Sequence, residues 1–84
     1  MGLFGSSKAQ RAAAAKEWAR RADEADKQAR EYAAEAAKYR KQLRDSSDPA
    51  ADRYMIRQAE ANQRIAEADA HSFRRTAANA LKWG

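Results

Sequence analysis

His71 is the side chain best suited to proton transfer or metal binding in this 84-residue chain, and it is the single histidine. It follows Glu67 by four positions, a spacing that brings two side chains together on one face of a helix. Such a pair acts in catalysis only inside a concave, preorganised pocket, whereas the residues around it are those of a charged helix face. We therefore expect a surface pair, no catalytic residue and no enzyme.

The sequence also lacks a set of metal ligands. Cysteine is absent, which excludes disulfides and thiolate metal sites, and one histidine cannot make an HExxH-like pair. We expect no metal site, no cofactor and no small-molecule substrate.

Binding to an anionic surface is the chemistry that the basic residues favour. The formal net charge is +5, and if the chain folds back on itself, eight basic side chains and one acid gather where its termini meet. Basic residues beside exposed apolar and aromatic side chains suit an anionic membrane surface. The candidate contacts are Leu3, Phe4, Lys8, Arg11, Arg20, Arg21, Arg74, Arg75, Lys82 and Trp83.

Nucleic acid is a second possible anionic partner, and a less favoured one. Arginines recur in the second half of the chain, where they could contact phosphates: Arg53, Arg57, Arg64, Arg74 and Arg75. Glu60 and Glu67 interrupt that face, and the chain contains no helix-turn-helix, zinc-finger or RNP-like pattern.

Two heptad repeats indicate the elements that position these residues. Apolar residues, mostly alanine, recur at alternating spacings of three and four, which is typical of a helix lying along another helix. We call the two repeats together the seam. Its first half is Trp18, Ala22, Ala25, Ala29, Tyr32, Ala36, Tyr39 and Leu43, and its second half is Ile56, Ala59, Gln63, Ala66, Ala70, Phe73, Ala77 and Ala80.

Helix boundary signals place one connection between two long helices. Ser7 and Gln10 fit a capping box, and Pro49 after Asp48 suits the start of a second helix. We predict a lead over 1–6 and a hairpin over 7–84, with helices at about 7–44 and 49–82 and a turn at 45–48. So short a connection makes the helices antiparallel, and matching large residues with small ones sets Trp18 against Ala77 and Ala22 against Phe73.

The composition predicts self-association. Alanine supplies 23 residues, leucine and isoleucine together five, and each buried methyl contributes only ~0.8 kcal/mol. Several apolar residues remain outside the seam, so we expect hairpins to dimerise into a four-helix bundle or a larger assembly. The candidate oligomer face comprises Tyr54, Ile65, Ala68, Ala33 and Ala37.

The charges are distributed as positive, negative and positive along the expected rod, which suits staggered packing of copies or contact with another protein. No apolar run approaches the ~20 residues of a bilayer span, so we expect a cytoplasmic protein that can be membrane-peripheral or virion-associated. The richness in alanine and arginine indicates a small bacterial or phage protein. In general plan, the Leu3–Phe4 lead before a long hairpin is similar to the much longer phage-shock and ESCRT-III-like membrane-remodelling proteins.

Overall fold

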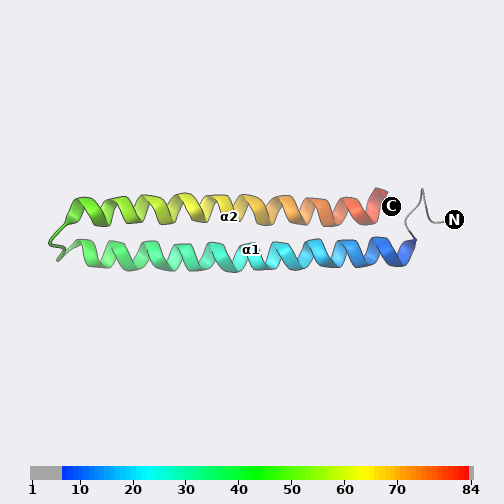
Figure 1. Cartoon of the computed structure of the whole chain (residues 1–84), viewed down its shortest axis with the longest axis horizontal. Helices are drawn as coiled ribbons and strands as arrows, with labels where there is room; N and C mark the ends of the chain where they lie inside the picture. Colours follow the sequence, from blue (N-terminus) through cyan, green and yellow to red (C-terminus); the bar gives the residue numbers. More distant parts are fainter. Residues whose placement is uncertain (1–6, 84) are drawn as a thin grey trace.

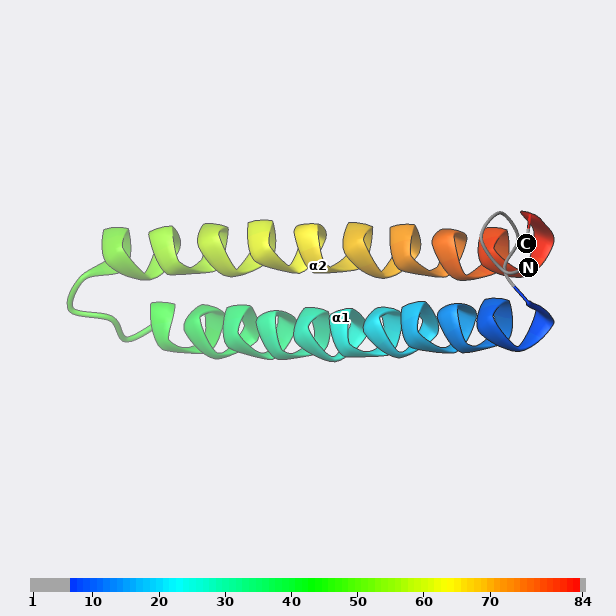
Figure 2. The same cartoon turned by 45° about the vertical axis from the view of Figure 1, so that its right-hand side comes forward.

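The computed structural model describes residues 7–83 as two long helices that pack side by side along their length (Figure 1). Helix α1 spans Lys8–Leu43 and helix α2 spans Pro49–Trp83. The two run antiparallel, so the start of α1 and the end of α2 share one end of the rod, which we call the open end (Figure 2). The predicted all-α fold with two helices is confirmed for the described part of the chain.

The start of α1 is fixed by the residues immediately before and after it. Ser7 Oγ accepts a hydrogen bond from the Gln10 backbone N–H at 3.0 Å, and Gln10 Oε1 accepts one from the Ser7 N–H at 2.9 Å. This reciprocal pair satisfies two amide donors that a helix leaves without intrahelical partners. The capping box expected from the sequence is therefore present.

The connection between the helices caps α2 in a similar local way. Ser46 Oγ accepts a hydrogen bond from the Asp48 N–H at 3.0 Å, and Asp48 Oδ1 accepts one from the Ala51 N–H at 3.2 Å. Pro49 opens α2 because its fixed φ suits the first helical position and its missing N–H would have no partner there. The chain reverses here, at the loop end of the rod.

The core consists of alanine alone. Within the described part of the chain, eight side chains are buried: Ala15, Ala22, Ala25, Ala29, Ala36, Ala59, Ala66 and Ala70. Seven of them belong to the predicted seam, and Ala15 extends it by one step toward the open end. The larger seam residues are half-buried. The alanine methyl groups hold the helices too close for a large side chain to lie between them, and a pair of helices leaves the two sides of the seam exposed to solvent.

Trp18 and Phe73 make a contact that the expected pairing of large residues with small ones did not include. Their rings contact each other with centroids 5.6 Å apart and planes inclined by 35°. Neither ring fits between backbones that alanine brings close, so both rings are only half-buried and meet at the margin of the alanine core. The Arg21 guanidinium lies 4.6 Å from the centroid of the Trp18 ring, a cation–π arrangement.

Candidate functional site

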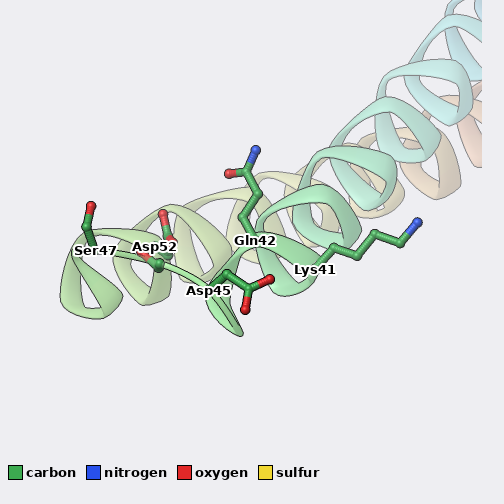
Figure 3. Close-up of a pocket in the computed structure, with 6 residues that line it drawn as sticks. Lys41, Gln42, Asp45, Ser47 and Asp52 are labelled. Carbon is green, nitrogen blue, oxygen red and sulfur yellow. The ribbon is translucent and has the colours of Figure 1, made fainter.

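A surface hollow of about 590 Å³ lies at the loop end. Its lining is polar: Lys41, Gln42, Asp45, Ser46, Ser47 and Asp52. The labelled side chains spread in different directions and do not converge on one point (Figure 3). Among residues 7–83, no group of three or more acids and histidines is arranged to hold a metal ion.

The expected pair of Glu67 and His71 is a feature of the surface. Both side chains are exposed, and the two form no hydrogen bond or ion pair with each other. Across the described range, neither helix has a stretch apolar enough to cross a bilayer. Three surfaces of the described residues differ in character.

The first surface is a line of ion pairs between the helices, which we call the paired edge. Arg40 of α1 pairs with Glu60 of α2, and Arg74 of α2 pairs with Asp26 of α1. Arg74 also reaches Asp23 at 3.5 Å. The hydrogen bond from Arg74 holds the pKa of the Asp26 carboxyl below its ordinary value and raises the pKa of Arg74 itself.

The second surface is the opposite side of the hairpin, which we call the acidic edge. It is defined by Glu24, Glu31 and Glu35 on α1 and Asp69 on α2, all exposed and none in an ion pair with a residue of 7–83. A hollow of about 280 Å³ opens here, with Glu24, Gln28 and Asp69 around Ala25 and Phe73. Arg20 and Arg21 also line it.

The third surface lies on the side of α2 that faces away from α1, and we call it the outer stripe. Tyr54 is 54% exposed and Ile65 is 59% exposed. Six uncharged residues follow one another here at heptad spacing: Tyr54, Gln58, Ala61, Ile65, Ala68 and Ser72. This is a second repeat on the same helix, directed away from the seam.

The residues of the expected oligomer face do not lie together. Tyr54, Ile65 and Ala68 belong to the outer stripe, whereas Ala33 is half-buried at the paired edge, in a hollow that Gln63 and Glu67 also line. Ala37 is exposed on α1 beside Ala34. Heptad spacing identifies faces of one helix, but the distribution of residues from two helices around the rod depends on how the helices meet.

The basic residues of the open end are partly engaged within the chain. Arg20 donates to Glu17 Oε1 at 2.7 Å, and Arg21 reaches the same oxygen at 3.4 Å. The hydrogen bond from Arg20 is the main reason that the pKa of Glu17 is lowered, and it raises the pKa of Arg20. Arg74 turns toward the acids of the middle region, so it contributes less positive charge to the open end than the sequence suggested.

The other expected anionic-surface contacts are distributed as follows. Lys8 is exposed at the start of α1 and Arg75 is exposed on α2, about two turns before its end, while Arg11 and Lys82 have interactions within the chain. Leu3 and Phe4 lie outside the described residues, and Trp83 is the last residue of α2. The sequence prediction missed Leu81, which is 63% exposed beside Lys82. Leu81 comes one residue after the seam residue Ala80, and successive helix residues point in different directions. This spacing indicated that the Leu81 side chain lies outside the core.

Comparison with protein-family models, with curated proteins and with solved structures finds no match to this chain.

Proposed function

We propose that this protein is a non-enzymatic structural or adaptor protein that associates with copies of itself through helix–helix contacts. The outer stripe is the observation that carries the proposal. Tyr54 and Ile65 are both more than half exposed, and all six residues of the outer stripe, from Tyr54 to Ser72, are uncharged. Covering such a face with another helix removes apolar area from water, which is the main favourable term in association.

The composition of the core supports the same function. All eight buried side chains are alanines, and no large side chain in the described part is fully buried. Short domains with so little buried apolar volume usually need a disulfide, a metal or a partner chain. The sequence has no cysteine, so a second copy is the simplest source of additional buried area. Two hairpins that share the outer stripe form a four-helix unit.

Analytical ultracentrifugation of two matched variants tests this proposal. Ile65→Asn removes an apolar side chain from the outer stripe, and Leu81→Asn removes an equally exposed one outside it. We expect Ile65→Asn to weaken association at least tenfold, or ~1.4 kcal/mol, and Leu81→Asn to leave it unchanged. Circular dichroism checks that both variants stay helical. A wild-type protein that remains monomeric at high concentration contradicts the proposal.

We propose peripheral binding to an anionic membrane as a second candidate, because Leu81 is 63% exposed beside Lys82 at the open end. An exposed leucine beside basic residues can enter the boundary between headgroups and acyl chains while the cations contact anionic lipids. Flotation with vesicles of phosphatidylserine and phosphatidylcholine tests it. Binding should fall in Leu81→Asn and on deletion of residues 1–6, and Ile65→Asn should bind as wild type. Equal flotation of all four proteins rules this candidate out.

A further inference from the structure

Two arginines border the outer stripe with a regular spacing. Arg57 and Arg64 are exposed on α2, and neither forms an ion pair with a residue of 7–83. They lie three residues before and four residues after Glu60, so they share the side of α2 that carries the paired edge. Seven residues separate them, which is ~10.5 Å along a helix.

Two glutamates on the other helix have the same spacing. Glu24 and Glu31 are exposed on α1 and also lack an ion pair within the described range. They lie four residues before and three residues after Gln28, so they share its side of α1, which is the acidic edge. The interval between them is again seven residues, or ~10.5 Å.

These four side chains cannot neutralise one another within one hairpin. The arginines lie toward the paired edge and the glutamates toward the acidic edge, on opposite sides of the rod. A symmetric antiparallel pair of α2 helices does not solve the problem. In that arrangement two-fold symmetry places each long side of the outer stripe against the same side of the other copy. Arg57 and Arg64 would therefore face the arginines of the second copy.

We infer that the acidic edge of a second copy covers the side of α2 that carries Arg57 and Arg64, which we call the basic margin. Arg57 then pairs with the partner's Glu31, and Arg64 pairs with the partner's Glu24. The equal spacing allows both ion pairs to form together. Glu24 and Asp69 also line the hollow of about 280 Å³, together with Arg20 and Arg21 of the same copy. This inference rests on the proposed function, because it specifies how the copies associate.

The contact uses two different surfaces of each copy, so it is a heterologous contact. Each added copy leaves one basic margin and one acidic edge uncovered. Further copies can therefore add, and the assembly lengthens unless the copies close into a ring. Exposed ion pairs add little affinity but select the orientation and disfavour wrong arrangements. The apolar outer stripe supplies the affinity and the charges select the partner surface.

Complementary charge reversal provides the test. Arg57→Glu/Arg64→Glu makes both surfaces acidic, and Glu24→Arg/Glu31→Arg makes both basic. We expect each variant alone to associate at least tenfold more weakly than wild type, a difference of ~1.4 kcal/mol. Mixing the two in equal amounts should restore assembly, because every acidic surface then has a basic counterpart. Sedimentation velocity follows the species, and circular dichroism confirms that each variant stays helical.

Two further proteins serve as controls. Lys27→Glu/Lys41→Glu has the same net charge change on the outer side of α1, and it should assemble as wild type. Arg57→Gln/Arg64→Gln removes the charges without adding acids next to Glu60, and it should weaken assembly in the same direction.

Three outcomes overturn the inference. If wild type assembles but charge reversal and mixing have no effect, this contact is wrong while the proposed self-association stands. If wild type is monomeric, both proposals fail. If the arginine variant assembles normally but no longer shifts a DNA duplex that wild type does shift, Arg57 and Arg64 serve nucleic acid instead.

Discussion

Replacing Ala36 by leucine tests whether alanine methyl groups set the separation of the two helices. Ala36 is 0% exposed and lies in the half of α1 nearer the loop. Among residues 7–83, every other buried side chain is also an alanine, so the fully buried part of the seam is built from methyl groups. A leucine here must push the backbones apart or leave its preferred rotamer.

The expected size of the effect follows from this packing. Adding methylene groups to a closely packed core costs about 1–3 kcal/mol. An 84-residue domain of ordinary stability unfolds with about 4–13 kcal/mol, so the change is a large fraction of the total. At about 4–8 °C per kcal/mol for a domain of this size, the melting temperature should fall by ~4 °C or more.

Thermal and urea denaturation followed by circular dichroism measure the change, at one protein concentration because association also stabilises the helices. Ala34→Leu is the matched control, since Ala34 lies two residues away on the exposed outer side of α1. It should change the free energy of unfolding by less than ~0.5 kcal/mol. If Ala36→Leu instead stabilises the protein relative to Ala34→Leu, the seam has spare volume and our account of close approach is wrong.

Two other sets of variants test the local structure. Ser7→Ala and Asp48→Ala each remove a cap acceptor, from the Gln10 N–H and the Ala51 N–H respectively. Each should lower the free energy of unfolding by about 0.5–2 kcal/mol in urea titrations, and no loss in either would show that the ends fray regardless of the caps. The pKa of Asp26 is lowered by Arg74, so its stabilising contribution is present above the unfolded pKa and is lost as pH falls through the lower folded value. Asp26→Asn should therefore flatten the acid side of the stability profile, and an unchanged profile would show that the pair contributes nothing measurable.

The elements that follow from local rules were predictable from the sequence. The capping box at Ser7 and the proline start at Pro49 each depend on a few neighbouring residues, and the structure contains both. The alanine repeat likewise indicated the buried face, although it missed Ala15 one step earlier. Such features depend on helix periodicity and end chemistry, which a single segment already contains.

The features that depend on both helices were not predictable in the same way. Arg74 was expected to belong to the basic open end, but it pairs with Asp26 and Asp23 because antiparallel packing brings the middle of α1 beside it. Trp18 was matched with Ala77 by size, and its contact with the Phe73 ring, one helical turn before Ala77, was not anticipated. Both outcomes depend on the lateral position of a side chain relative to the facing helix.

The sequence by itself therefore determined two helices, their ends and the alanine face between them, because these depend on spacings within one segment. Only the tertiary structure decided which charges are paired across the helices and which stay unpaired at the acidic edge. The physical reason is that the lateral position of each side chain is fixed by the packing of one helix against the other. The two unpaired rows at opposite sides of the rod, Arg57 with Arg64 and Glu24 with Glu31, became visible only in that packed arrangement.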